Sequence, residues 1–164
     1  MLTETPDETG STPRWLDGAE MRAWRGFIEG SQRLMEVLNR ELQAGHGLSL
    51  ADYRILVMLS ESPDGSVRMS ELADGVLSSR SRLTHQVRRM ESEGLVVRST
   101  CVDDGRGVLA VITDQGREKL AEAAPTHVRG VRNYLIDLLE PAELTGVAEV
   151  FGKVDAALGK RDDA

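Results

Sequence analysis

The 164-residue chain has one cysteine, Cys101, and no apolar run near the ~18 residues that a membrane helix needs. A single cysteine excludes an intramolecular disulfide framework and is typical of the reducing cytoplasm. The first residues, MLTETPDETGSTP, lack the basic region and apolar stretch of a secretory signal. We therefore expect a cytoplasmic protein, nucleoid-associated if it acts on DNA, that does not enter a membrane.

Patterns that carry catalysis or metal binding are also missing. The sequence contains no GxSxG, P-loop or GxGxxG motif and no recognisable Cys–His arrangement. Potential metal ligands (His46, His85, His127 and Cys101) are scattered, and paired-cysteine zinc sites are excluded. We therefore expect a protein that is not an enzyme and that carries neither a cofactor nor a metal.

Acidic residues outnumber basic ones in the chain, 27 to 20, but one segment is strongly basic. The net charge of −7 disfavours nucleic acid as a partner if charge is averaged over the whole chain. However, SSRSRLTHQVRRM, residues 78–90, contains four arginines and a histidine and no acidic residue. Because the distribution of charge matters more than its sum, this segment is the first candidate for a nucleic-acid interface.

Capping and turn residues mark where helices begin. Serine, threonine and aspartate satisfy the free N–H groups of a first helical turn, and proline is tolerated there. Apolar residues then recur at three- and four-residue steps, as they do on one face of a helix. In addition to the helix expected in the basic segment, helices are expected to start at Asp17, Ser49, Ser70, Thr113 and Pro141.

Two short strands follow the basic segment. LVVRSTC and VLAVI read as a hairpin joined by the polar loop VDDGRG. Pro125 should kink or break the long helix from Thr113 to about Leu139, because proline removes a hydrogen bond and clashes with the preceding turn. The predicted fold is mainly α with a small β-hairpin wing, the order of a winged helix-turn-helix.

Long apolar stripes run along both ends of the chain. Such stripes exceed what so small a core can bury, and a second copy of the chain would cover them. Their members are Trp24, Phe27, Ile28, Ser31, Leu34, Met35, Leu38 and Leu42, and Leu144, Val147, Val150, Phe151, Val154 and Leu158. The expected organisation is a disordered tail at 1–16, an N-terminal dimerisation helix at 17–48, a DNA-binding lobe at 49–112 and C-terminal dimerisation helices at 113–160.

The basic segment should be a helix with one face in the core. Leu83, Val87 and Met90 fall at positions i, i+4 and i+7, so they should point inward together. Arginine can bond guanine through two N–H groups, and serine or threonine can bond base edges or phosphates. The residues left facing outward are Ser79, Arg80, Ser81, Arg82, Thr84, His85 and Arg88. A solvated cationic face is the alternative interpretation, but the position between a short helix and a hairpin favours DNA.

The loop DDGRG offers a second contact. Arg106 at a hairpin tip can enter the minor groove, where its charge suits narrow A·T-rich DNA. Asp104 would otherwise be a poor neighbour for phosphate, so we interpret it as holding Arg106 in position. A plain Asp-Gly turn with an incidental arginine remains the alternative.

The stretch SELADGVLSSRSRLTHQVRRMESEGLVVRSTCVDDGRGVLAVITDQGREKL resembles the core of the MarR family of bacterial transcription regulators. The family's wing pattern is matched by Asp104, Arg106, Ile112, Thr113 and Gly116, with isoleucine in place of leucine. The resemblance implies a triangular homodimer with one recognition helix per subunit, binding double-stranded DNA at a palindromic operator. It also implies regulation, usually repression that a small ligand relieves, although some members activate.

The family's ligand pocket lies between the dimerisation helices and the DNA-binding lobe. The polar or aromatic residues that can line it here are Trp24, Arg25, His46, Tyr53 and Arg54. Trp24 also fits the core and His46 also fits a plain loop. Anionic phenolic ligands are common in the family, so a small anionic or aromatic effector is the expected class.

Two other functions stay open. A winged helix can serve as a protein-interaction module without specific DNA binding, although the arginines of residues 79–88 argue against this. A thiol-based redox sensor would keep DNA binding and use Cys101 as its switch. Neighbouring Asp103 and Asp104 disfavour the thiolate, while Arg98 or Arg106 can offset them. We favour Cys101 as an inert small residue over a redox switch.

We predict that Arg106→Ala weakens operator binding with little loss of stability, because a residue at the wing tip should be exposed. Operator titration measures the first effect and thermal unfolding the second. Unchanged affinity in a normally folded variant would refute the minor-groove role.

Overall fold

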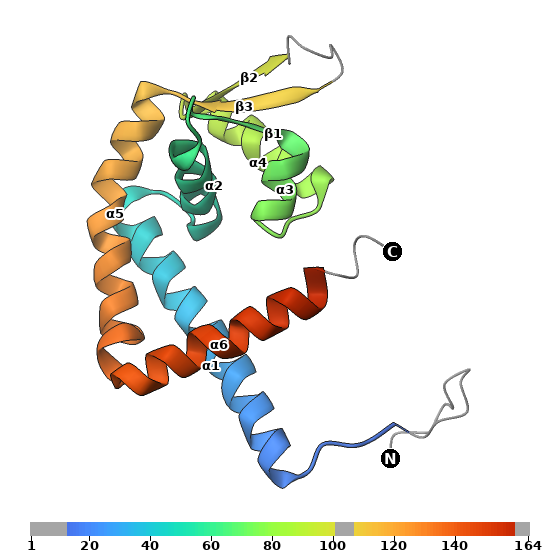
Figure 1. Cartoon of the computed structure of the whole chain (residues 1–164). Coiled ribbons are helices and arrows are strands. Elements are labelled where there is room, and N and C mark those ends of the chain that lie inside the picture. The colour runs from blue at the N-terminus through green and yellow to red at the C-terminus, as the bar shows by residue number, and fades with distance from the viewer. Residues whose placement is uncertain (1–12, 101–106, 160–164) are drawn as a thin grey trace, which may run out of the picture. The chain divides into compact units, whose positions relative to one another are not determined.

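The computed structural model describes residues 13–100 and 107–159 (Figure 1). Within these ranges the chain forms mainly helices and one small sheet, which confirms the predicted fold class. In chain order the elements are α1 (Gly18–His46), α2 (Leu50–Glu61), β1 (Ser66–Arg68), α3 (Met69–Gly75), α4 (Arg80–Ser92), β2 (Val96–Thr100), β3 (Val108–Ile112), α5 (Asp114–Tyr134), the 3-10 turn η1 (Ile136–Leu138) and α6 (Pro141–Gly159).

Internal contacts divide the chain into two units, Met1–Arg33 and Leu34–Ala164. The first contains the N-terminal part of α1, which begins where the sequence predicts. Asp17 accepts hydrogen bonds from the backbone N–H groups of Ala19 and Glu20, at 2.7 and 2.9 Å, and the Glu20 carboxylate accepts from the Asp17 backbone N–H at 2.9 Å. This capping box satisfies N–H groups that have no partner inside the helix.

The expectation that Trp24 belongs to the core is wrong for the described chain. Trp24 lies 6.0 Å from Phe27 between ring centroids, and its side chain is 52% exposed. The three- and four-residue spacing identifies a shared helix face correctly, but it does not say what covers that face.

The core of the second unit joins α2, α3, α4 and the sheet. Ser49 caps α2, where its hydroxyl accepts from the Asp52 backbone N–H at 3.0 Å. The apolar faces of these short helices meet over one continuous cluster that excludes water. Its members are Leu42, Leu48, Tyr53, Ile55, Leu56, Leu59, Leu72, Ala73, Leu83, Val87, Met90, Leu95, Val96, Ala110, Ile112 and Ala123.

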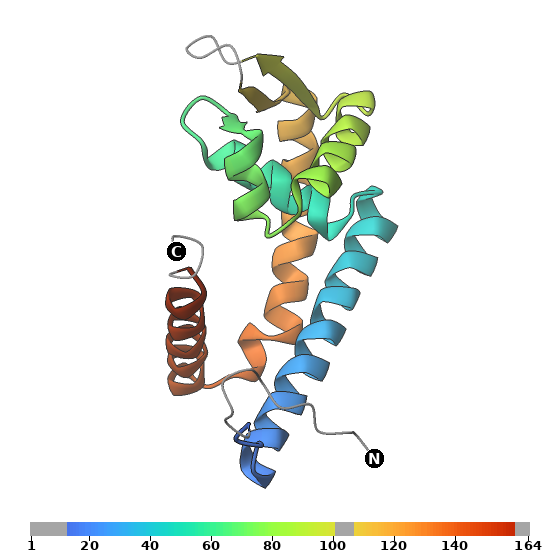
Figure 2. The same cartoon turned by 90° about the vertical axis from the view of Figure 1, so that its right-hand side faces the viewer.

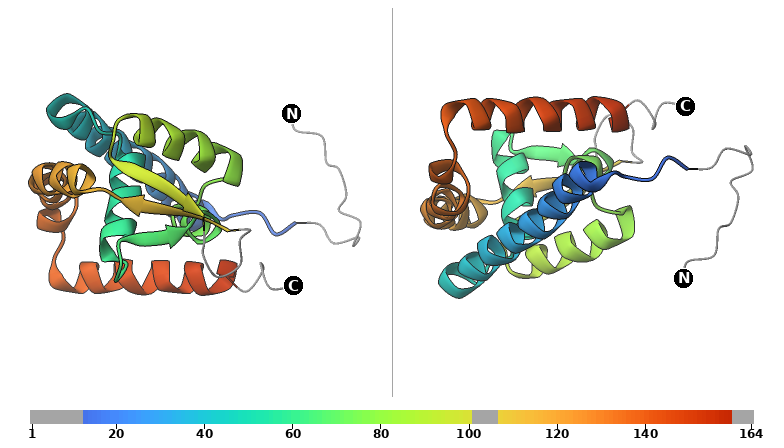
Figure 3. Two further views of the ribbon diagram at one scale, coloured as in Figure 1. Left: turned by 90° about the horizontal axis from the view of Figure 1, so that it is seen from above. Right: turned by 90° about the horizontal axis from the view of Figure 1, so that it is seen from below.

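The sheet has three strands, one more than the predicted hairpin. Its order is β1-β3-β2, with both pairs antiparallel, so β3 lies in the middle (Figure 3). Val111 of β3 pairs with Ser66 on one side and Val97 on the other. The added strand spans only three residues, which is too short to show the alternation that marks a strand in sequence. The sheet covers one end of α2, α3 and α4 (Figures 1 and 2).

Helix α5 begins beside the sheet and runs away from it (Figure 2). The Thr113 hydroxyl accepts from the Gly116 N–H at 2.9 Å and donates to the Gly94 carbonyl at 2.7 Å. A Cβ atom on Gly116 would lie 2.1 Å from the Leu95 carbonyl oxygen, so only glycine allows this approach. Thr113 and Gly116 therefore fasten α5 to the corner between α4 and β2.

The break expected at Pro125 is absent, because α5 continues through it from Asp114 to Tyr134. The helix then ends earlier than the predicted Leu139, and η1 follows it. Pro141 opens α6, as expected for proline in a first helical turn. No helix in the described ranges is long and apolar enough to span a membrane.

We predict that Leu83→Ala lowers the free energy of unfolding by about 2–5 kcal/mol, the usual effect of truncating a buried leucine. Leu83 is fully buried in the core cluster. Chemical denaturation measures the loss, and Ser81→Ala on the exposed side of the same helix is the control. A neutral Leu83→Ala would show that this face of α4 is not part of the core.

Candidate nucleic-acid interface

Helix α4 faces the core in the predicted orientation. Leu83, Val87 and Met90 are all fully buried. The helix begins at Ser79, whose hydroxyl accepts from the Arg82 backbone N–H at 3.3 Å. Burial of one face fixes the opposite face toward solvent, and that opposite face carries the arginines.

Most of the residues predicted to face outward do so. Thr84 is the exception, because it is partly buried and its hydroxyl donates to the Arg80 carbonyl at 2.7 Å. Its hydroxyl hydrogen is therefore already used within the helix. The exposed members of the predicted set are Ser79, Arg80, Ser81, Arg82, His85 and Arg88.

Three of the arginines on α4 carry charge without a salt bridge. In the described ranges, the salt bridges around this helix involve Arg89 and Arg98, and none involves Arg80, Arg82 or Arg88. Guanidinium groups stay charged at all ordinary pH values and donate in a planar fork that fits phosphate or guanine. This part of the surface therefore offers three guanidinium groups to an anionic partner.

Arg89 has a different role, which the sequence did not reveal. Its guanidinium lies 2.5 Å from the Asp52 carboxylate of α2 and 3.1 Å from Glu93. Gln86 donates to the same Asp52 oxygen at 3.0 Å, and the Ser49 hydroxyl donates to the other oxygen at 2.5 Å. Asp52 is only 1% exposed, so this network joins α2 to α4 from inside the lobe.

The hydrogen bonds determine the protonation of Asp52. Burial raises the pKa of its carboxyl group, but hydrogen bonds from Arg89, Ser49 and Gln86 and the charge of Arg89 together outweigh burial. The pKa therefore lies below the ordinary value of 3.8. At neutral pH the group is a charged acceptor that binds its donors strongly.

Glu91, the first acidic residue after the basic run, is also engaged. It accepts from the Arg98 backbone N–H at 3.1 Å and from the Arg98 side chain at 2.8 Å. These bonds, with a smaller contribution from the charge of Arg88, lower the pKa of the Glu91 carboxyl. The acidic end of α4 is thus tied to β2 through Arg98.

Three residues assigned to the wing lie outside the described residues. These are Asp104 and Arg106, interpreted as a minor-groove contact, and Cys101, interpreted as a possible redox switch. Strands β2 and β3, which carry this loop, are described on both sides of it.

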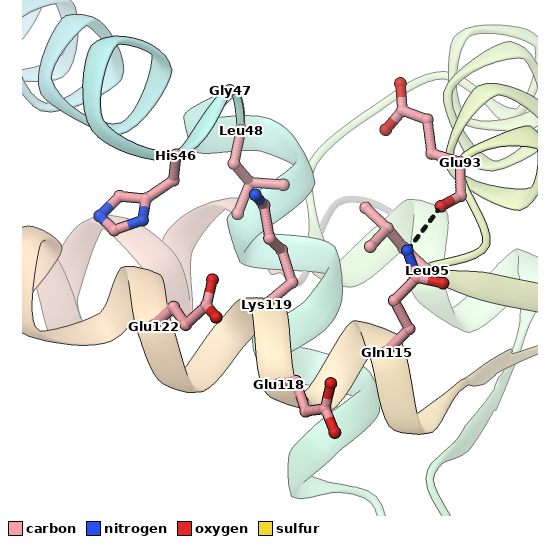
Figure 4. A pocket seen from close by; sticks show the side chains of 9 residues that line it. All are labelled: His46, Gly47, Leu48, Glu93, Leu95, Gln115, Glu118, Lys119 and Glu122. Carbon is pink, nitrogen blue, oxygen red and sulfur yellow. Dashed lines mark hydrogen bonds between the residues drawn. The ribbon is translucent and has the colours of Figure 1, made fainter.

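A cavity of about 350 Å³ lies beside α5 (Figure 4). Of the five predicted pocket residues, His46 lines it, and its Nε2 lies 2.8 Å from the Thr126 hydroxyl. Lys119 extends from α5 toward Leu48, and Gln115 donates to the Glu93 carbonyl at 3.3 Å (Figure 4). The full lining is His46, Gly47, Leu48, Glu93, Leu95, Gln115, Glu118, Lys119 and Glu122.

The structure does not bring the other predicted pocket residues to this cavity. Tyr53 is buried in the core, 4.5 Å from the ring of His127, and burial lowers the pKa of that histidine. Arg54 is exposed on α2. Trp24 and Arg25 belong to the first unit.

Within residues 13–100 and 107–159, no three histidine, cysteine or acidic residues come together in a way that could hold a metal ion. His46 and His127 instead contact Thr126 and Tyr53.

Comparison with known proteins agrees with this geometry. Residues 46–107 match the model of the MarR family. The structure is similar to that of AbsC, a MarR family transcriptional regulator from Streptomyces coelicolor, with 42% sequence identity and a TM-score of 0.86, over 90% of this chain and 99% of that one. It is also similar to Sco3205, a MarR family transcriptional regulator from the same organism in complex with DNA, with 41% identity and a TM-score of 0.86, over 89% and 92% of the two chains.

More distant similarity extends to the HTH-type transcriptional repressor YetL from Bacillus subtilis (strain 168). The two sequences are 23% identical over 112 residues, 68% of this chain and 66% of YetL. The chain spans just under two thirds of the length of the curated relatives it matches.

We predict that Asp52→Ala lowers the free energy of unfolding at pH 7 by about 1–3 kcal/mol, because Ser49, Gln86 and Arg89 lose the buried acceptor that they share. The folded-state pKa of Asp52 is depressed, so its stabilisation is complete above the unfolded value and is lost as pH falls through the folded pKa. The gap between wild type and variant should therefore narrow below about pH 4.

Chemical denaturation across this pH range measures the effect. Glu93→Ala is the control, since it removes only the exposed partner of Arg89 and should change stability by less than about 1 kcal/mol. An equal effect of the two variants would contradict the role of Asp52 as the centre of the network.

Proposed function

Because the chain belongs to the MarR family of winged helix-turn-helix transcriptional regulators, we propose that it binds specific sites in double-stranded DNA through α4. The family consists of regulators, which confirms the expectation that the chain is not an enzyme. Acting on the chromosome, it would work in the cytoplasm at the nucleoid.

The exposed arginines of α4 are the main observation that supports this proposal. Arg80 and Arg82 lie in the first turn, the end that enters the major groove in helix-turn-helix proteins. Arg88 lies further along the same helix, where it can contact phosphate. Sco3205, a similar regulator in complex with DNA, supports DNA as the partner.

We further propose that the protein acts as a homodimer. Helix α6 exposes an apolar face that a soluble monomer would leave in contact with water. A second copy of the chain is the occupant we favour, because a two-fold dimer presents two copies of α4 to a palindromic operator. The exposed residues of this face are Val147, Val150, Phe151, Val154 and Leu158.

We also propose that a small molecule regulates DNA binding. Repression that an effector relieves is the mode we favour, and the similarity to the repressor YetL supports it. The cavity beside α5 has the volume of a small-molecule site. Its lining includes Glu93, Glu118 and Glu122 against Lys119, which suits a cationic effector better than the anionic one expected from the sequence.

Two alternatives have weaker support. A protein-interaction module would be expected to present apolar or acidic residues on α4, whereas this helix presents arginines. A redox switch at Cys101 would keep DNA binding and make it sensitive to peroxide, and Cys101→Ser tests this possibility.

We predict that Arg82→Ala weakens operator binding by about 1–3 kcal/mol and relaxes preference at one base position, as for loss of a bidentate contact to a base. Affinities for the operator and for single-base variants measure this. Arg129→Ala, an exposed arginine on α5, is the matched control. Uniform weakening on all sequences would instead identify Arg82 as a phosphate contact.

The general test is titration of the protein against its own upstream intergenic DNA, with scrambled competitor, at two salt concentrations. We expect saturable, selective binding of one dimer per palindrome that weakens steeply with salt, because binding releases counterions. Equal and weak binding to all fragments, followed by failure of a genome-wide selection, would favour the interaction-module alternative.

A further inference from the structure

The turn between α3 and α4 contains a strained and exposed leucine. Leu77 has φ +53°, in the left-handed region that side chains other than glycine rarely adopt, and its side chain is 86% exposed. Among the described residues it is the one non-glycine residue with positive φ. A leucine in this conformation is strained, because its Cβ atom crowds the backbone.

The hydrogen bonds around it identify the position. The Ser78 N–H donates to the Ala73 carbonyl at 2.9 Å, and the Leu77 N–H donates to the Asp74 carbonyl at 3.1 Å. This pair of bonds defines a Schellman motif, whose left-handed residue is usually glycine. The residue after it is usually apolar and packs back on the helix.

The same chain builds the usual form of this motif at the end of α4. The Leu95 N–H donates to the Met90 carbonyl and the Gly94 N–H to the Glu91 carbonyl, both at 3.0 Å. Gly94 has φ +76°, and Leu95 is only 5% exposed. There the glycine takes the strained conformation and the leucine fills the core.

The end of α1 follows the same rule. Gly47 has φ +62° and Leu48 is buried. At the end of α3 this order is not kept, because Leu77 takes the left-handed position and Ser78 the inward one. The leucine therefore adds strain and packs little within the lobe, so the fold itself does not explain it.

Its surroundings indicate what it contacts. Leu77 lies two residues before Ser79, the N-cap of α4, and three and five residues before the exposed arginines Arg80 and Arg82 in sequence. Figure 1 shows the turn between α3 and α4 that carries it. The N-terminal end of a recognition helix is the part that reaches base edges. The C5-methyl group of thymine is the apolar group presented in the major groove.

We propose that Leu77 packs against the C5-methyl group of a thymine in each operator half-site and so helps to set sequence specificity. This inference rests on the proposed function. The contact compensates for the strained backbone only in the complex with DNA, which explains a leucine where the fold favours glycine.

Three variants separate the contact from the strain. Leu77→Ala removes the side chain beyond Cβ but keeps the backbone strain, and Leu77→Gly removes both. Leu77→Met keeps an apolar side chain long enough to make the same contact. We expect the alanine and glycine variants to bind the operator about four- to tenfold more weakly, and the methionine variant to bind nearly as wild type. Leu77→Gly should raise Tm by about 2–4 °C, whereas Leu77→Ala should not.

The DNA supplies the second half of the test. Replacing half-site thymines one at a time by deoxyuridine removes only the methyl group. At one position we expect wild type to lose about fourfold in affinity and the alanine variant to lose nothing. Thymines outside the half-sites are the control.

Each outcome decides between the two proposals. If wild type shows no saturable binding to any DNA, the proposed function and this inference both fail. If wild type binds its operator but Leu77→Ala binds equally well, or responds to deoxyuridine as wild type does, only the role of Leu77 is overturned. Weakening by Leu77→Ala that is independent of every methyl group would place the contact on the sugar–phosphate backbone and refute thymine recognition.

Discussion

The buried carboxylate of Asp52 determines how α4 is held in the lobe. It receives hydrogen bonds from Ser49 on its own helix and from Gln86 and Arg89 on α4. Burial of Leu83, Val87 and Met90 sets which face of the helix meets the core, but the hydrophobic effect itself is non-directional. The ionic hydrogen bonds add direction, because a guanidinium donates in a plane.

The same network explains how an acidic chain keeps a cationic surface. Carboxylates close to α4 are occupied by specific arginines: Asp52 and Glu93 by Arg89, and Glu91 by Arg98. Each of these three carboxylates is therefore engaged by an arginine within the lobe, and the group as a whole carries one negative charge in excess. The arginines that remain, at the N-terminal end and outer face of α4, define the local field, whatever the net charge of the whole chain.

Local patterns in the sequence predicted most of the fold. Capping residues placed the starts of α1, α2, α5 and α6, and the spacing of Leu83, Val87 and Met90 gave the facing of α4.

What the sequence did not show depends on contacts between distant segments. Asp52 and Arg89 are 37 residues apart, so their pairing leaves no local signal. The strand Ser66–Arg68 exists because β3 is beside it, and the strain at Leu77 appears only in its backbone conformation.

Helix α5 is held differently at its start and at Pro125. Near its start, the Gly116–Leu95 contact and the bonds of Thr113 leave no room for rotation against the lobe. Further along, Pro125 has no N–H to donate to the Ala121 carbonyl, so the helix lacks one of its own hydrogen bonds there. The start of α5 is therefore held by its own tight contact with the lobe. At the proline, where the helix lacks a hydrogen bond of its own, the contacts of Thr126 with His46 and of His127 with Tyr53 brace it from outside.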